Sequence, residues 1–177
     1  MKFETERLIL RSWQDSDADD LFRYASDPRI GPIAGWPVHT SIEHSLEIIR
    51  SVLSKPETYA LTLKSNDHPI GSIGLLIGNS SHIGLPPDEA EIGYWIGVPY
   101  WGQGLIPEAV NELVRYSFET LELKKLWCRY FEGNTKSKRV SEKCGFKIHH
   151  TNKNLSWPLT GDIRTINYTC LIRELIS

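Results

Sequence analysis

The chain has 177 residues, a formal charge of −2, 40% hydrophobic residues and 24% charged residues, values that predict a single globular domain over residues 1–177. No segment approaches the ~20 consecutive apolar residues that span a bilayer, which disfavours a membrane protein. The near-neutral charge disfavours a nucleic-acid binder, which normally carries a basic face.

The first half of the chain predicts two helices among three strands. Residues 5–12 alternate in polarity as a strand with one buried face does, and a helix capped by Asp15 or Ser16 follows. A capping box at residues 40–43 begins a second helix. Between the helices, residues 28–38 contain three prolines and two glycines and predict a loop of the kind that walls a substrate pocket. Two strands, 59–64 and 70–77, then form a hairpin.

A strand, a glycine-bearing turn and an amphipathic helix follow one another in residues 89–119. Gly102 and Gly104 let the backbone approach a ligand closely, because they carry no Cβ. Pro107 suits a first helical turn, so a helix is expected from about Leu105. Free N–H groups at its positive end would hold a phosphate or pyrophosphate. A plain strand-to-helix turn is the commoner explanation of an isolated G-x-G.

The last third predicts a strand at 125–131, a short helix at 135–143 that Gly145 closes, and strands at 146–150 and 164–172. Hairpins precede the glycine turn and helix-linked strands follow it. This order predicts an α/β (α+β) fold, in which a mixed sheet carries helices on its faces.

Three cysteines stand at wide spacing, without a C-x-x-C or a histidine pair at metal-ligand intervals. We therefore expect no disulfide and no metal site, and we interpret the cysteines as small core side chains. The three cysteines are Cys128, Cys144 and Cys170.

The amino-terminal residues lack the apolar core of a signal peptide, which predicts a cytoplasmic protein.

Five segments carry a resemblance to one family. They are T-E-R-L-I-L-R at 5–11, E-I-G-Y-W-I at 91–96, W-G-Q-G-L-I at 101–106, N-T-K-S at 134–137 and S-E-K-C-G-F at 141–146. In these segments the chain resembles the GNAT superfamily of acetyl-CoA-dependent N-acetyltransferases, most closely its RimJ/RimL-like branch. The resemblance covers nearly the whole chain.

The chain departs from the family pattern at three positions. Trp101 replaces the usual Arg or Gln of the pyrophosphate loop, and Ile106 replaces its final Gly or Ala. Ser141 stands where many members place a tyrosine that protonates the leaving thiolate. The resemblance therefore implies the binding loop but leaves the general acid to be found.

For the fold, the resemblance implies a GNAT-like, mostly antiparallel sheet of about seven strands that splays between the fourth and fifth. The pantetheine arm of acetyl-CoA would lie in this opening. An N-cap role for Asn134, and a solvent-exposed face for the basic residues after it, are equally open. The implied contacts are Trp95, Ile96 and Gly97 with the pantetheine amides, Trp101, Gly102, Gln103, Gly104, Leu105 and Ile106 with the pyrophosphate, Asn134 and Ser137 with the pantetheine end, and Lys136, Lys138 and Arg139 with the adenosine phosphates.

Acyl transfer requires a neutral amine, so a carboxylate or a water chain must accept a proton. Glu91 is the candidate base, because strand alternation places it opposite Ile92, Tyr94 and Ile96. An exposed glutamate, or one paired with an arginine, explains it equally well. A backbone N–H near residues 95 and 96 would stabilise the oxyanion. For the departing thiolate, Ser137 is the first candidate hydrogen-bond donor and Ser141 the second.

The sequence therefore predicts transfer of an acetyl group from acetyl-CoA to a primary amine by direct attack in a ternary complex. The acceptor would be a protein N-terminus or a small amine, and loops 28–38 and 150–161 would wall its pocket. A non-catalytic acyl-CoA-binding or sensing module is the alternative. A nucleoside triphosphatase is disfavoured because the loop lacks Gly-Lys-Ser/Thr. The protein is expected to be a monomer or a homodimer.

Overall fold

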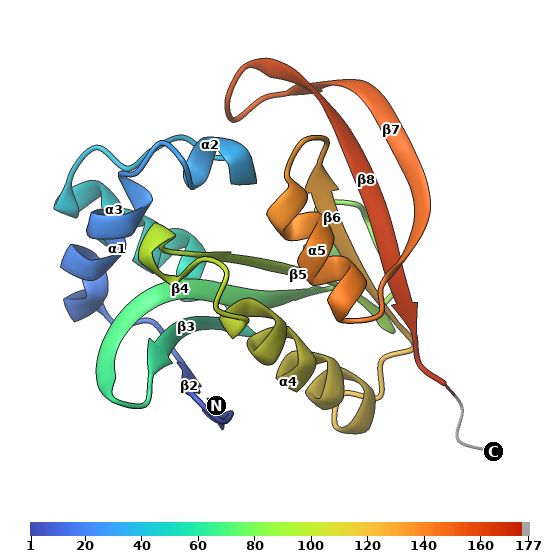
Figure 1. The fold of residues 1–177 in the computed structure, drawn as a ribbon, viewed down its shortest axis with the longest axis horizontal. Helices are drawn as coiled ribbons and strands as arrows, with labels where there is room; N and C mark the ends of the chain where they lie inside the picture. The colour runs from blue at the N-terminus through green and yellow to red at the C-terminus, as the bar shows by residue number, and fades with distance from the viewer. Residues whose placement is uncertain (175–177) are drawn as a thin grey trace.

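The structure is a computed structural model that describes residues 1–174. These residues form an eight-stranded sheet with helices on its faces (Figure 1), which confirms the predicted fold class. The strand beyond the expected seven is the first, a two-residue segment too short to show a pattern. The strands, in spatial order, are β1 (Phe3–Glu4), β2 (Leu8–Arg11), β3 (Thr58–Leu63), β4 (Asn66–Ile77), β5 (Glu89–Ile96), β6 (Lys125–Phe131), β8 (Asp162–Ile172) and β7 (Lys147–Trp157).

The sheet opens between β5 and β6. These two strands are parallel, and their pairing runs only from Glu89 opposite Lys125 to Ile92 opposite Cys128. Beyond that point β5 continues to pair with β4, and β6 continues to pair with β8. The predicted splay is therefore present, at the strands now numbered β5 and β6.

The helices differ from the predictions mainly at their ends. Residues 28–38 were expected to be a loop, but α2 forms one helical turn there, because Pro32 stands in its first turn where its missing N–H costs nothing. Gln14 and Asp17 form a capping box before α1, in place of the expected cap at Asp15 or Ser16. Ser41 is the N-cap of α3. The helical segments are η1 (Asp15–Asp17), α1 (Ala18–Ala25), α2 (Gly31–Ala34), α3 (Ile42–Ile48), η2 (Ile49–Leu53), η3 (Gly78–Ser80), η4 (Val98–Tyr100), α4 (Leu105–Glu119) and α5 (Thr135–Lys143).

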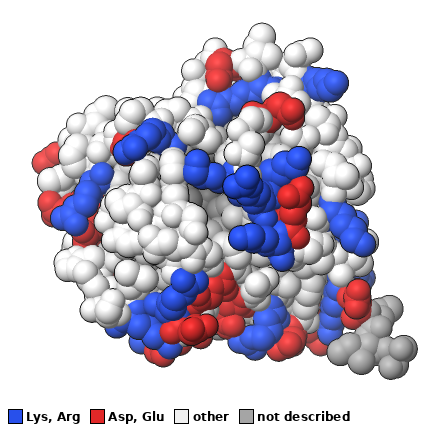
Figure 2. Space-filling view, viewed as in Figure 1, with Lys and Arg blue, Asp and Glu red and all other residues white. Residues whose placement is uncertain are grey.

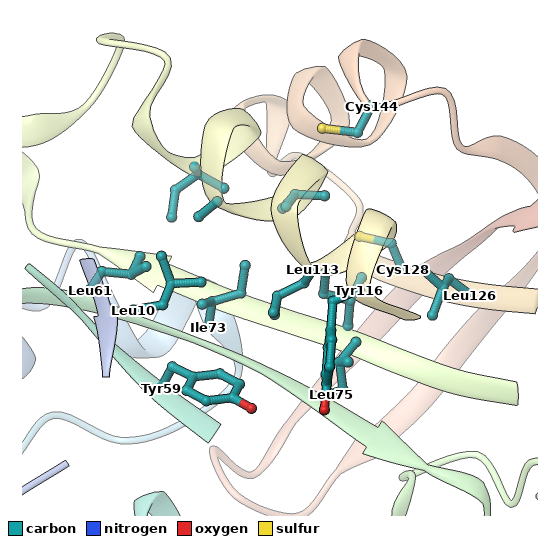
Figure 3. Close-up of a cluster of buried hydrophobic side chains, with 14 of the residues drawn as sticks. Leu10, Tyr59, Leu61, Ile73, Leu75, Leu113, Tyr116, Leu126, Cys128 and Cys144 are labelled. Atoms are coloured by element: carbon teal, nitrogen blue, oxygen red, sulfur yellow. The ribbon is translucent and has the colours of Figure 1, made fainter. Parts of the chain in front are cut away.

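Both faces of the sheet are covered by helices. On one face the core packs beneath α4 and includes Ile73, Leu113 and Leu126 (Figure 3). On the other face Ala60 packs with Leu21 of α1 and with Ile49. Alternation along the strands supplies both clusters, because neighbouring residues point to opposite faces. The opening between β5 and β6 therefore lies between the core beneath α4 and the cluster that contains α1.

Candidate active site

The glycine turn before α4 presents a row of unused backbone donors. Gly102 and Gly104 have φ of 73° and 76°, the left-handed region that glycine adopts without strain. The N–H groups of residues 102–106 have no acceptor within the described part of the chain. They lie at the positive end of a 15-residue helix. This cradle fits a pyrophosphate.

A hydrogen-bonded clamp holds this turn in place. Glu108 of α4 accepts hydrogen bonds from the Thr5 hydroxyl at 2.5 Å and from the Arg7 N–H at 2.7 Å. The Arg7 guanidinium also binds Glu108, and it donates to the Gln103 carbonyl at 2.9 Å. The T-x-R segment thus fixes the first turn of α4. Sequence reasoning recognised the segment but missed this role, because its partner lies about a hundred residues away.

Backbone direction along β5 decides which groups face the opening. The Gly97 N–H donates to the Ile70 carbonyl of β4 at 2.8 Å, so Trp95 and Gly97 direct their backbone groups toward β4. Tyr94 and Ile96 direct theirs toward the opening. Of the residues expected to contact the pantetheine, Trp95 and Gly97 therefore face β4, whereas Ile96, like Tyr94, offers its backbone groups to the opening.

Trp101 contacts both β5 and α5. Its indole N–H donates to the Ile96 carbonyl at 3.0 Å, which leaves the Ile96 N–H as the group that faces the opening. The Lys136 ammonium lies 4.2 Å from the centre of the Trp101 ring, a cation–π contact between α5 and the glycine turn. Trp101, which departs from the family pattern, thus joins β5 to α5.

The start of α5 is capped and basic. Asn134 Oδ1 accepts the Ser137 N–H at 3.2 Å, so the N-cap interpretation of Asn134 is confirmed. Lys138 pairs with Glu142 at 3.9 Å, and Arg139 is exposed. Figure 2 shows Lys and Arg gathered over α5. These cations suit phosphate groups, and their side chains are accessible to them.

Glu91 lies where β5 and β6 separate, and its contacts argue against a base. Its carboxylate is 2.6 Å from the Arg129 guanidinium and accepts the His82 backbone N–H at 3.1 Å. Burial acts to raise the pKa of Glu91, but the His82 hydrogen bond and the Arg129 charge outweigh it and hold the pKa below its ordinary value. A carboxylate stabilised in this way is a weak proton acceptor, so the contacts of Glu91 favour the alternative of a carboxylate paired with an arginine.

Ser141 has no proton left for a thiolate. The Thr169 hydroxyl donates to the Cys128 carbonyl at 2.9 Å, so the Ser141 hydroxyl, 2.8 Å from the Thr169 hydroxyl, must donate to it. Ser141 is also almost fully buried. We correct this candidate: Ser141 is a core residue.

Ser137 keeps its place among the candidates, and it has an unexpected neighbour. Its hydroxyl lies 3.0 Å from the hydroxyl of Tyr94, a β5 residue. Sequence reasoning quoted Tyr94 within I-G-Y-W but assigned it no role. The signal was present in that motif, although the contact with α5 was not.

Aromatic side chains surround the opening on the α1 side of the sheet. Trp36 packs against Trp95 at 5.9 Å between ring centres, and Phe131 packs against Trp157 at 4.9 Å. The Trp157 indole N–H donates to the Gly35 carbonyl at 2.7 Å. The two loops predicted to wall the acceptor pocket, 28–38 and 150–161, therefore meet. We call Trp36, Trp95, Phe131 and Trp157 the aromatic frame.

Residues 1–174 contain neither a metal-binding cluster nor a membrane-spanning helix. No group of three or more His, Cys, Asp or Glu side chains in this part could hold a metal ion. None of its helices has the length and apolar character needed to cross a bilayer. The three cysteines there are free thiols rather than disulfides.

Comparison with known proteins identifies the family. The family model described as "Acetyltransferase (GNAT) domain" matches residues 7–147. The chain belongs to the GNAT acetyltransferase family. This GNAT enzyme is 30% identical over 148 residues to the uncharacterized N-acetyltransferase p20 of Bacillus licheniformis, a match that covers 81% of this chain and 80% of the relative.

Solved structures agree with this assignment in fold. A GNAT-family acetyltransferase from Bacillus anthracis superposes with a TM-score of 0.85 at 22% identity, covering 97% of this chain and 98% of that one. The ribosomal L7/L12 alpha-N-protein acetyltransferase RimL, solved with coenzyme A, superposes at 0.78 with 17% identity and the same coverage. Ribosomal-protein acetyltransferases are among the solved structures with which this chain shares its fold. The GNAT protein is an acetyl-CoA-dependent N-acetyltransferase.

Proposed function

We propose that this GNAT enzyme acetylates the N-terminal amine of a protein or peptide by direct attack on acetyl-CoA in a ternary complex. The supporting observation is the aromatic frame around the opening between β5 and β6. Half-buried Trp36, Trp95, Phe131 and Trp157 offer apolar contact area beside the place where the thioester would lie. The acceptor would enter from the α1 side.

The charges around the frame favour a peptide over a polycationic amine. Glu91 is paired with Arg129, and Asp162 is paired with Arg164 at 2.9 Å. Glu132 is a single carboxylate that keeps its charge, because the Asn167 amide that donates to it is neutral. Polyamines and aminoglycosides need several carboxylates that are not already neutralised. A peptide N-terminus brings one amine on a largely uncharged body.

In this mechanism the protein binds and orients both substrates. The free N–H groups of residues 102–106 and the cations of α5 would hold the phosphates of acetyl-CoA. The Ile96 N–H would stabilise the oxyanion, because it points into the opening. Water would accept the amine proton, because the carboxylate of Glu91 is held by Arg129. Ser137 would donate to the departing thiolate.

The proposal is tested by measuring coenzyme A release from acetyl-CoA with a panel of amines. The panel compares short peptides that have free N-termini with spermidine, an aminoglycoside and free amino acids. Matched peptides with blocked N-termini and one internal lysine serve as controls. We expect the highest kcat/KM with free peptide N-termini. A preference for spermidine, or for the blocked lysine peptides, would refute this acceptor class.

A further inference from the structure

Two hydroxyl groups meet on the α5 side of the opening, where β5 and β6 separate. Tyr94 lies two residues beyond Ile92, which is the last β5 residue paired with β6. Its hydroxyl is 3.0 Å from the hydroxyl of Ser137, in the first turn of α5, and 3.7 Å from Cys128 Sγ. In the proposed mechanism Ser137 donates a hydrogen bond to the departing thiolate, whereas Tyr94 has no role.

The Tyr94 hydroxyl has a single proton to donate. Burial raises the pKa of Tyr94 well above its ordinary value, so the phenol stays protonated at every working pH. Three acceptors lie within reach, at 3.0 Å for Ser137 Oγ, 3.3 Å for the Ser137 carbonyl and 3.7 Å for Cys128 Sγ. Ser137 Oγ is the nearest of the three, and in this pair either hydroxyl can be the donor. When Tyr94 donates to Ser137 Oγ, the proton of Ser137 is directed elsewhere.

We propose that Tyr94 is a positioning residue, which turns the Ser137 hydroxyl toward the sulfur of the departing coenzyme A. This inference rests on the proposed attack of an amine on the thioester. It gives Tyr94, on a strand, part of the task of the tyrosine that Ser141 replaces on α5. A hydroxyl that accepts one hydrogen bond is also a stronger donor in the next, because the two bonds polarise each other.

Acetyl transfer leaves both Tyr94 and Ser137 chemically unchanged. The amine nitrogen forms a bond to the carbonyl carbon, the carbon–sulfur bond breaks, and its electron pair stays on sulfur. The proton that the nitrogen loses ends on the sulfur by way of water. Between these events the Ser137 hydroxyl stabilises the thiolate by a hydrogen bond, while the Tyr94 phenol keeps its own proton.

A double-mutant cycle tests the coupling. Tyr94→Phe, Ser137→Ala and the double variant are compared with the wild type in saturating acetyl-CoA, with whichever amine is turned over fastest. We expect kcat to fall roughly two- to tenfold in Tyr94→Phe and roughly tenfold to a hundredfold in Ser137→Ala. The double variant should match Ser137→Ala, because Tyr94 acts through Ser137. KM for acetyl-CoA should stay within about twofold in all three.

Three further variants separate this role from packing. Tyr59→Phe removes another phenol hydroxyl from the same core, one bound to Glu57 at 2.5 Å, and should keep wild-type kcat. Ser137→Thr keeps a hydroxyl, so it should recover most of the kcat that Ser137→Ala loses. Tyr94→Phe should lower kcat in the Ser137→Thr background, as it does in the wild type. A chain that carries 4-aminophenylalanine at residue 94 keeps a donor there and should regain the activity that Tyr94→Phe loses.

The outcomes distinguish the inference from the proposed function. Wild-type kcat in Tyr94→Phe, losses that multiply in the double variant, or no recovery with 4-aminophenylalanine would each overturn the role of Tyr94. The acceptor proposal would survive those results. A wild-type enzyme that prefers polyamines would overturn only the acceptor class, because the cycle is then run with that amine. A wild type that releases no coenzyme A with any amine would overturn both.

Discussion

The Glu91 carboxylate lies beside the Arg129 guanidinium at the point where two parallel strands separate. Its side chain is 7% exposed and that of Arg129 is 12% exposed. Water therefore reaches neither charge well, and each is stabilised mainly by the other. We interpret the pair as a tie between β5 and β6. In this interpretation the pair holds the two strands together at the point where they separate.

Glu91→Gln is therefore expected to act mainly on stability. Removing one partner of a buried pair costs about 3–5 kcal/mol of unfolding free energy, measured by urea denaturation. The folded pKa of Glu91 lies below its ordinary value of 4.5, so its contribution is complete above pH 4.5 and is lost as the pH falls below that value. Glu119→Gln, which breaks an exposed pair with Arg115, should cost less than about 1 kcal/mol. Unchanged stability, with turnover that recovers at high pH, would restore Glu91 as the base.

His39 gives the protein a second pH response. Its ring is buried and its Nδ1 lies 2.8 Å from the Ser45 hydroxyl. Burial, with a smaller effect of His44, lowers the pKa of His39 from 6.5 to about 4. Between these values the unfolded chain binds a proton that the folded chain does not. Stability is therefore complete above pH 6.5 and falls as the pH drops toward 4.

His39→Gln should remove this response, because glutamine does not titrate. In the wild type the free energy of unfolding should fall by at most about 1.4 kcal/mol per pH unit between pH 6.5 and 5. Urea denaturation at pH 7.5, 6.5, 5.5 and 5.0 measures both slopes. Equal slopes in the two proteins would show that another group is responsible.

At the scale of single residues, the sequence predicted orientation but not partners. Alternation correctly placed Glu91 on the face opposite Ile92 and Ile96, since these two belong to the core beneath α4. Its partner Arg129 lies 38 positions later on another strand, at a separation that no local pattern encodes. The same limit hid the contact of Tyr94 with Ser137.

Among the elements, the glycine turn makes the most direct prediction. Gly104→Val should weaken acetyl-CoA binding at least tenfold by calorimetry, because a β-branched residue resists a φ of 76° and would move the N–H groups. Gly161→Val is the matched control, since Gly161 has a φ of 73° and open space around it in the β7–β8 turn. Both variants should lose similar stability. Equal acetyl-CoA affinity in the two would place the pyrophosphate elsewhere.

Elements bounded by clear turn signals were predicted well. The strand at 125–131 and the helix at 135–143 have their predicted bounds, because glycine and asparagine separate them from their neighbours. The strand expected at 146–150 instead extends over residues 147–157. Its residues are mostly exposed on both faces, so no alternation of polar and apolar side chains marks it. A pattern that depends on burial cannot show a strand that is not buried.

At the scale of the whole molecule, one hydrogen bond joins Gly35, at the end of α2, to Trp157 of β7, 122 positions later in the chain. Trp157→Phe keeps an aromatic ring, although a smaller one, and removes the donor to the Gly35 carbonyl. We expect KM for a peptide acceptor to rise roughly two- to tenfold, while the Kd for acetyl-CoA stays the same. Trp127→Phe is the control, because its indole binds Glu89 at 2.6 Å instead. An unchanged acceptor KM in Trp157→Phe would separate this contact from acceptor binding.

The global arrangement was predicted through motifs more than through periodicity. Hairpins and helix-linked strands indicated a mixed sheet, and the family resemblance supplied the splay. The aromatic frame escaped prediction because its four members come from four separate segments. Their proximity is a result of tertiary structure alone.

The short pairing of β5 with β6 leaves two kinds of amide along one strand. Trp95 and Gly97 direct their N–H groups to β4, whereas Tyr94 and Ile96 direct theirs to the opening. In deuterated water the first pair should exchange slowly in every state, because opening them requires the strand to leave the sheet. The second pair should exchange fast in the free enzyme and slowly once acetyl-CoA lies beside it. Along β5, protection on binding should therefore alternate from one residue to the next.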